Sequence, residues 1–272
     1  MPHTLGSVRD TVERLWPLAG AESWDAPGLV SGDPDATVER ILLSVDAVAD
    51  TVEEAIALDS DLLLVHHPLL LRGVTTVAED SYKGALLARL IRSGCALLSA
   101  HTNADVVAEG VSAVLAGALG VEDAVPIVSG LDPSTGIGRV GRLPEPTTLG
   151  ALARRVADLV PPTASGVRAA GDYQRAVSTV AVCGGAGDSL LAEAVVLAAD
   201  VFITADLRHH PASEARERSL IGRGPALIDV SHWASEWLWL DVAAGQLSRE
   251  LPGVEIVVSE LRTDPWDFAV VQ

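Results

Sequence analysis

Two kinds of hydrophobic pattern alternate along the first half of this chain. Near-continuous apolar runs predict buried β-strands over 41–48, 61–68 and 95–101. Apolar residues spaced three and four positions apart predict helices over 8–16, 51–58, 83–94 and 106–120. Gly94 closes the third of these helices in the position of a C-terminal cap. Strands that alternate with helices in this way predict a parallel or mixed sheet covered by helices.

The same alternation returns in the second half, after a turn-rich segment at 126–180 that contains a short strand near 137–143 and a helix over 148–160. Strands are predicted over 177–185, 200–206, 225–231 and 254–261, and helices over 189–198, 212–220 and 232–251. The fold class is therefore α/β. We expect one unit made of two lobes of similar architecture, about 1–125 and 126–272, each a mixed or parallel sheet flanked by helices.

The net charge of the chain argues against two classes of binding partner. The 272 residues include 19 Lys and Arg against 37 Asp and Glu, a formal net charge of -18. This excess argues against binding to nucleic acid, because few cations are available to neutralise phosphates, and against an anionic membrane surface. No apolar run approaches the ~18 residues of a spanning helix. The N-terminal residues lack the basic and apolar regions of a signal peptide, and Cys95 and Cys183 lack CxxC spacing. We expect a soluble cytoplasmic protein with buried, reduced thiols.

Six of the seven histidines follow predicted strands: His66, His67, His101, His209, His210 and His232. In an open α/β sheet, ligands bind in the crevice at the carboxyl ends of the strands, so these positions converge on one rim. Adjacent side chains on a regular strand point to opposite faces. Pro68 ends the strand after His67, which lets the chain turn and aim both imidazoles of the pair into one site. The alternative for an isolated pair is that one ring packs in the core and the other is solvated.

The segment SHWASE at 231–236 carries the sharpest local signal. Ser231 suits the N-cap of a helix that begins at His232. His232 and Glu236 then lie one turn apart on the same face, so an imidazole nitrogen and a carboxylate can bind one cation. The alternative is an ordinary ion pair on the surface of a helix.

A further carboxylate, Asp105, lies just past a strand in the segment HTNAD, where His101 or Asn103 could orient a ligand. By itself Asp105 could instead form an Asx turn that caps the following helix. The set of candidate metal ligands is His66, His67, Asp105, His232 and Glu236. Five ligands exceed a closed tetrahedral site and predict two divalent ions, with Glu236 as their bridge. Nitrogen and oxygen ligands without a thiolate suit Zn, Mn, Fe or Co alike.

Six ordered segments together resemble the NGG-interacting-factor-3-like family: WDAPGLVSGDP, VHHPLLLRG, SAHTNADV, CGGAGDS, ITADLRHH and LIDVSHWASE. The resemblance extends from Trp24 to the C-terminus. It implies a toroidal homohexamer whose dinuclear metal centre lies in the cleft between the lobes and uses the same five ligands. Many family members are named GTP cyclohydrolase 1 type 2 homologues. Some carry an extra domain between the lobes, for which 126–180 is too short.

This chain departs from the family at two positions, Ala205 and Ser231, where glycine is usual. Both replacements are small, so the resemblance still implies intact ligation. Asp206 and His210 match an Asp and a His of the family and could act as acid–base groups or support the ligands. The alternative is a capped helix start with surface histidines.

The glycine-rich segment CGGAGDS at 183–189 is predicted to form a turn between a strand and a helix. Such a turn could present backbone N–H groups to a phosphate. It matches neither GxxxxGK[ST] nor GxGxxG, so a tight turn that needs glycine for its backbone is the favoured interpretation.

Two functions remain. The first is a metal-dependent hydrolase that acts on a nucleotide or another phosphate-bearing small molecule, with the metal ions activating water and polarising the substrate. Its candidate acid–base residues are His101, Asp206 and His210. The second is a non-enzymatic metal-binding or scaffold ring. The presence of acid–base candidates favours the enzyme.

Overall fold

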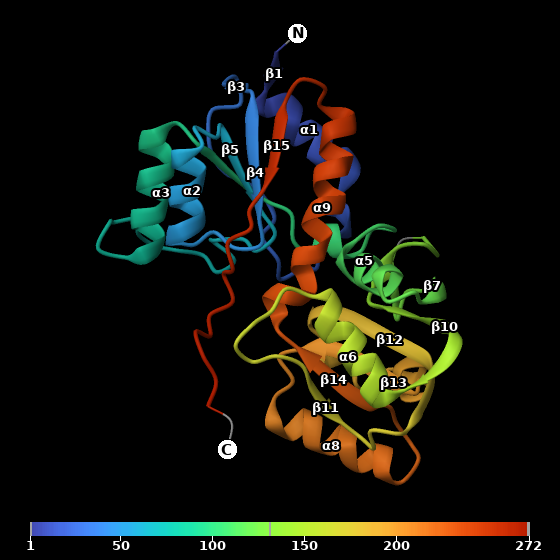
Figure 1. Ribbon diagram of the computed structural model, residues 1–272. Coiled ribbons are helices and arrows are strands. Elements are labelled where there is room, and N and C mark those ends of the chain that lie inside the picture. Colours follow the sequence, from blue (N-terminus) through green and yellow to red (C-terminus); the bar gives the residue numbers. More distant parts are fainter. Residues whose placement is uncertain (1, 131, 271–272) are drawn as a thin grey trace. The chain divides into compact units, whose positions relative to one another are not determined.

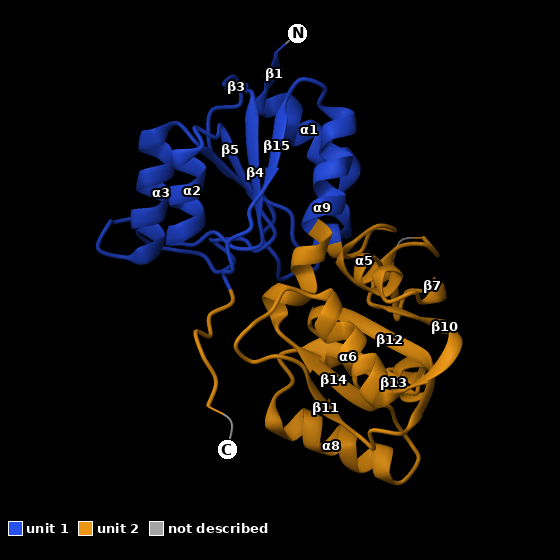
Figure 2. Ribbon diagram, viewed as in Figure 1, with its two compact units in different colours: residues 1–104, 240–263 blue, residues 105–239, 264–272 orange. Residues whose placement is uncertain are grey.

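The computed structural model describes residues 2–130 and 132–270, in two compact units (Figures 1 and 2). The first unit consists of 1–104 and 240–263, and the second of 105–239 and 264–272. These bounds differ from the two continuous lobes expected from the sequence. The reason is that the C-terminal strand β15 (Glu255–Val258) returns to the first unit and pairs in parallel with β4 (Arg40–Ser44).

The first unit is built on a five-stranded mixed sheet. Its four parallel strands lie in the order β15, β4, β5 and β6, and β2 adds an antiparallel edge. The remaining bounds are Leu62–Val65 for β5, Ala96–Ser99 for β6 and Gly28–Ser31 for β2. Every residue of β5 and β6 is buried, which explains their unbroken apolar runs. A two-stranded ribbon, β1 (His3–Thr4) with β3 (Thr37–Val38), lies near the N-terminus.

Helices cover both faces of this sheet. In Figure 1, α2 (Ala49–Ala57) and α3 (Tyr82–Ser93) lie on one side, and α1 (Leu5–Leu15) lies on the other with the later part of α9 (His232–Glu250). A short 3₁₀ helix, Leu18–Gly20, follows α1. Helix α3 ends at Gly94 with φ 77°, the left-handed cap predicted from the sequence.

The second unit has a six-stranded mixed sheet in the order β11, β14, β13, β12, β10, β7. The strands β12, β13 and β14 are parallel, and the others join antiparallel. In the same order the bounds are Arg168–Ala170, Ala226–Val230, Val201–Ala205, Ala176–Ala186, Arg139–Thr148 and Glu122–Val125. A small ribbon pairs β8 (Val128–Ser129) with β9 (Gly136–Ile137).

Two helices of the second unit are shorter than the sequence pattern predicts, whereas the one predicted over 212–220 begins three residues earlier, at His209. Their bounds are Thr102–Asp105 for α4, which starts in the first unit, Val111–Ala118 for α5, Leu149–Leu159 for α6, Ala194–Leu197 for α7 and His209–Leu220 for α8. The helix predicted over 106–120 begins only at Val111. The one predicted over 189–198 is a 3₁₀ turn, Asp188–Leu190, followed by α7.

Together the two units confirm the α/β class with mixed sheets flanked by helices. Within residues 2–130 and 132–270, none of the helices has both the length and the apolar composition needed to cross a bilayer.

Candidate metal centre

Three histidines gather in the first unit at the carboxyl ends of two adjacent parallel strands. His66 and His67 follow β5, and His101 follows β6 two residues after its last residue. Their ring centroids are 5.1 Å apart for His66 and His67, 5.1 Å for His66 and His101, and 5.4 Å for His67 and His101. One ring nitrogen from each lies within 4.8 Å of the other two. The strand-end placement predicted for these residues is therefore confirmed, and His101 is the third member of the group.

All three rings are held by acceptors at Nδ1, and the first two belong to His66 and His67. His66 is fully buried and donates from Nδ1 to the carbonyl oxygen of Ala100, at 2.8 Å. His67 contacts Oδ1 of Asp46 through its own Nδ1, at 2.7 Å. Since a carbonyl can only accept, the neutral His66 ring carries its lone pair on Nε2, and the carboxylate favours the same tautomer of His67. Metal-ligating histidines are usually oriented through their second nitrogen in this way.

The third ring, His101, is held by Asp25. Its Nδ1 lies 2.8 Å from Oδ1 of Asp25, whose side chain is completely buried. The other carboxylate oxygen accepts from the backbone N–H and the hydroxyl of Thr102. Burial raises the pKa of the Asp25 carboxyl, but hydrogen bonds from His101 and Thr102 outweigh burial and hold that pKa well below its ordinary value. The charged carboxylate therefore fixes the orientation of the His101 ring.

Trp24 lies beside this group. Its ring meets the His101 ring edge to face, with centroids 5.9 Å apart, and 58% of the residue is exposed. An exposed indole next to the three imidazoles gives a flat apolar surface at the site.

In the second unit, the first turn of α9 carries a histidine and a carboxylate in contact. The Nε2 atom of His232 lies 3.0 Å from Oε1 of Glu236, as their spacing of four residues predicts. Glu236 is only 3% exposed. The other ring nitrogen, Nδ1, lies 2.8 Å from Oδ2 of Asp206, which follows β13. The Ser231 hydroxyl accepts from the Ala234 N–H at 3.3 Å, which confirms the predicted N-cap.

The charge of these carboxylates acts strongly on the ring. Burial alone would lower the pKa of His232, but the negative charge of Glu236 and hydrogen bonds to Asp206 and Glu236 raise it well above its ordinary value. The pocket formed by the two carboxylates therefore favours a positive charge at Nε2, whether it is a proton or a metal cation.

The carboxylate of Asp105, at the end of α4, acts on the same region of the second unit. Burial raises the pKa of the Cys183 thiol to about 12, and the negative charges of Asp105 and Glu236 both add to this effect. Both carboxylates thus act on the same thiol at the end of β12.

Gly185 permits this arrangement. It has φ 68°, and a Cβ atom at this position would lie 2.4 Å from Oε1 of Glu236 and 3.2 Å from Nε2 of His232. The segment predicted to form a glycine-rich turn is in fact the end of β12, which continues to Ala186. Its glycines allow close packing. The N–H groups of Gly184 and Gly185 donate to the hydroxyls of Ser112 and Ser235, so a phosphate cradle is not supported.

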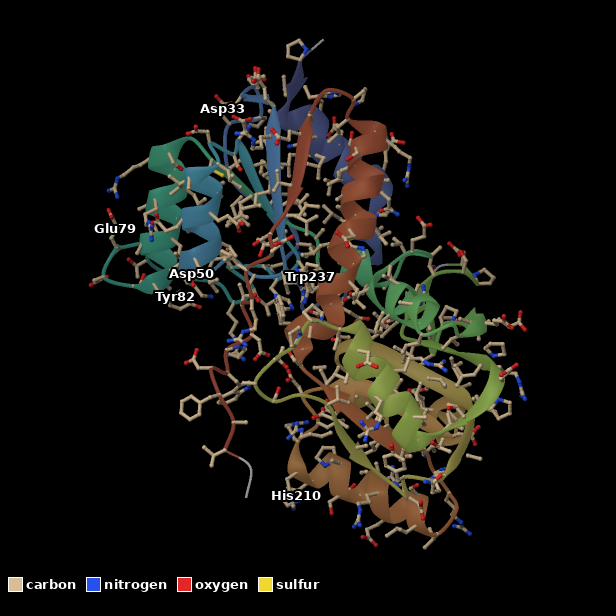
Figure 3. The ribbon with its side chains drawn as sticks, in the orientation of Figure 1. Asp33, Asp50, Glu79, Tyr82, His210 and Trp237 are labelled. Carbon is tan, nitrogen blue, oxygen red and sulfur yellow. The ribbon has the colours of Figure 1, made fainter. Side chains whose placement is uncertain are left out.

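Among the described contacts, none joins His210 to a proposed metal ligand. This histidine is exposed near the start of α8 (Figure 3), and among the described residues its ring contact is with His209, at 5.2 Å between centroids. Asp206, in contrast, contacts His232 directly.

Sequence reasoning misses Asp25, Asp46 and Gly185. Asp46 lies two residues beyond the end of β4, at the same rim as the histidines, and that position is the signal that could have found it. Asp25 belongs to the segment WDAPGLVSGDP, which contributes to the sequence prediction only through the family resemblance.

Comparison with known proteins gives a consistent result. The family model described as Duf34/NIF3 (NGG1p interacting factor 3) matches residues 3–265. A Streptomyces coelicolor protein named GTP cyclohydrolase 1 type 2 homolog is 48% identical over 271 residues, covering 96% of this chain and 93% of its own length. A Mycobacterium tuberculosis protein with the same name is 36% identical, covering 97% of each chain. That alignment spans 374 positions, so the mycobacterial protein has segments without a counterpart among these 272 residues.

Solved structures share the fold. A Bacillus cereus protein related to NIF3 has a TM-score of 0.89 at 22% identity, and it covers 99% of this chain and 100% of its own. The Staphylococcus aureus protein SA1388 has a TM-score of 0.88 at 25% identity, with the same coverage.

Proposed function

Because this chain belongs to the Duf34/NIF3 family, we propose that it is a hydrolase that uses two divalent metal ions and acts on a nucleotide or another phosphate-bearing small molecule. The proposed ligands are His66, His67, Asp105, His232 and Glu236, with Glu236 as the bridge. As the resemblance implies, the proposed assembly is a toroidal homohexamer.

The observation that carries this proposal is the fixed orientation of the imidazoles. Acceptors hold Nδ1 of His66, His67 and His232, so Nε2 is the ring nitrogen that would bind a metal ion. Such oriented rings, with carboxylates and without a thiolate ligand, suit Zn, Mn, Fe or Co. His101, whose ring is held by Asp25 in the same manner, lies next to His66. The donor set therefore fits the proposed ions.

Bound divalent ions would supply two kinds of chemistry: they lower the pKa of water from ~16 toward ~7 and polarise a phosphoryl or carbonyl oxygen. The side chains of the protein would hold and transfer the protons that the reaction needs. Asp206 holds a proton between its Oδ2 and Nδ1 of His232, and its exposed side chain can exchange that proton with solvent or substrate. We assign acid–base roles to Asp206, His101 and His210, of which Asp206 has direct contact with a proposed ligand.

Three observations support the proposed substrate class. A planar ring can stack on Trp24, and base–aromatic stacking contributes about 1–3 kcal/mol. Divalent ions would also attract an anionic substrate to a protein whose net charge is -18. The name of the relatives, GTP cyclohydrolase 1 type 2 homolog, points to the same class.

The test is turnover by metal-loaded protein on a panel of nucleotides and phosphoesters. We expect one or more substrates to be hydrolysed, with activity lost in His67→Ala and Glu236→Ala. His209→Ala is the matched control, because this exposed histidine of α8 is outside the proposed ligand set. Metal binding without turnover on the whole panel would contradict the hydrolase and favour the metal-binding scaffold. Activity that survives in both ligand variants would contradict the proposed site.

A further inference from the structure

The chain after β15 approaches the proposed ligands through two consecutive side chains. In the first unit, the hydroxyl of Thr263 donates to Oδ2 of Asp46. The other oxygen of the same carboxylate, Oδ1, lies 2.7 Å from Nδ1 of His67. One carboxylate therefore links Thr263 to a proposed metal ligand.

The next residue, Asp264, makes the corresponding contact within the second unit. Its Oδ1 accepts from the Ser231 hydroxyl at 2.5 Å, and its Oδ2 accepts from the Trp266 N–H at 3.3 Å. Ser231 is the N-cap of α9 and immediately precedes His232. A hydroxyl has one hydrogen, so when Ser231 donates it to Asp264, a lone pair remains for the N–H of Ala234. Asp264 therefore orients the cap at the start of the ligand-bearing helix.

We propose that Thr263 and Asp264 are positioning residues for the metal ligands, one for His67 through Asp46 and one for His232 through Ser231. This inference rests on the proposed function. Asp46 is partly exposed, so without the Thr263 hydroxyl its carboxylate can rotate toward water and leave the His67 ring less well oriented. Without Asp264, the Ser231 hydroxyl can turn away from Ala234 and loosen the first turn of α9.

Packing does not explain why the chain follows this path. The side chains beyond Asp264 are largely exposed, with Trp266 at 64%, Phe268 at 79% and Val270 at 76%. The hydrogen bond that Thr263 donates and the one that Asp264 accepts, rather than burial of these apolar groups, therefore fix the beginning of the C-terminal segment, each within its own unit.

The experiment compares paired substitutions that remove or keep each hydrogen bond. Thr263→Val removes the hydroxyl, and Thr263→Ser keeps it. Asp264→Ala removes the acceptor, and Asp264→Asn keeps an oxygen that can accept from Ser231. Ser259→Ala is the matched control, because Ser259 donates to Glu54, another C-terminal hydrogen bond of the first unit, and does not contact Asp46 or Ser231 through that bond. The readouts are the Zn²⁺ dissociation constant against a competing chelator and the absorption spectrum of the Co²⁺-substituted protein.

We expect Thr263→Val and Asp264→Ala to raise the Zn²⁺ dissociation constant about 10-fold or more and to change the Co²⁺ spectrum. The dissociation constants of Thr263→Ser, Asp264→Asn and Ser259→Ala for Zn²⁺ should stay within about threefold of the wild-type value. Their Co²⁺ spectra should match that of the wild type. Wild-type affinity and spectrum in both Thr263→Val and Asp264→Ala would overturn the inference while leaving the proposed function intact. A wild-type protein that binds no Zn²⁺ would overturn both.

Thermal unfolding of the metal-free variants separates positioning from folding. We expect Thr263→Val and Asp264→Ala to gain less stability than the wild type when Zn²⁺ is added, so that each variant loses more stability relative to the wild type with Zn²⁺ than without it. An equal loss of stability with and without Zn²⁺ would show a purely structural role and would overturn the inference.

Discussion

Gly185 and Glu236 approach so closely that a methyl group on the glycine would lie 2.4 Å from the carboxylate oxygen Oε1. Only a residue without a side chain lets the end of β12 pass Glu236 and His232 at this distance. The glycine run that could be taken for a phosphate-binding turn thus has a different purpose, which is to make room for two proposed metal ligands.

Substituting this glycine therefore tests the site directly. We expect Gly185→Ala to lower the affinity for Zn²⁺ at least about tenfold, because the new methyl group displaces the Glu236 carboxylate. Gly222→Ala is the matched control, since Gly222 has a similar φ of 71° but open space at the Cβ position. Both variants should lose about 1 kcal/mol of unfolding free energy to the left-handed backbone. Equal Zn²⁺ affinity in the two variants, measured by chelator competition, would contradict this account.

The buried carboxylate of Asp25 predicts a large effect on stability. Its oxygens accept from Nδ1 of His101, from the N–H and hydroxyl of Thr102 and from the N–H of Ala26. We expect Asp25→Asn to reduce the free energy of unfolding in urea by about 2 kcal/mol, because the amide NH₂ group would face donors. Asp33→Asn should stay within about 0.5 kcal/mol, since Asp33 is exposed. If Asp25→Asn also lost no more than about 0.5 kcal/mol, Asp25 would not be what holds His101.

Trp24 should contribute to the binding of a ring-bearing substrate. We expect Trp24→Ala to raise the dissociation constant for a guanine nucleotide about 10-fold, and Trp24→Phe to raise it less, because phenylalanine retains a flat face for stacking. Isothermal titration calorimetry measures the dissociation constants for the nucleotide and for inorganic phosphate, which serves as the ligand without a ring. An equal effect of Trp24→Ala on both ligands would contradict stacking as the cause.

The thiol of Cys95 gives a prediction about pH. Burial raises its pKa from 9.0 to about 12, and the negative charge of Asp61 adds to this. At pH 8 only about one thiol in 10⁴ is then ionised, so the native protein should resist thiol reagents and react rapidly in urea. Since the folded pKa is raised, the stabilisation is complete below pH 9 and is lost as the pH rises toward 12.

Labelling with a chromogenic disulfide reagent checks this prediction. Rapid reaction of Cys95 in the native protein at pH 8 would contradict the burial of this thiol. An unfolding free energy that stays constant between pH 9 and pH 11 would contradict the raised pKa.

Local patterns predict the parts of the site that depend on one chain segment. The His66–His67 pair follows a strand whose apolar run is unmistakable, and the contact between His232 and Glu236 follows from helical geometry alone. Ser231 and Gly94 are likewise recognisable as helix caps. These features need no knowledge of the tertiary structure.

Groups that orient the ligands depend on contacts between distant segments. Asp46 reaches His67 across 21 positions, and Asp25 reaches His101 across 76. The position of Asp46 near the end of an apolar run marks it as a rim residue, but nothing local indicates that it contacts His67. Asp25 lies in a segment without a periodic pattern, so the sequence does not distinguish it from a solvated surface residue. The requirement for Gly185 arises only when β12 and α9 pack together.

The same reasoning explains the differences in the fold. The division into units could not be predicted, because the pairing of β15 with β4 joins residues more than 200 positions apart. The edge strand β7 (Glu122–Val125) is exposed throughout and has no apolar alternation to reveal it.

The number of divalent ions that the protein retains tests the central claim most directly. After saturation with Zn²⁺ and gel filtration, elemental analysis should give two ions per chain for the wild type. Glu236→Gln should retain fewer, because the bridging carboxylate is lost. A wild-type protein that retains less than one ion per chain, or a Glu236→Gln variant that still retains two, would contradict the dinuclear centre.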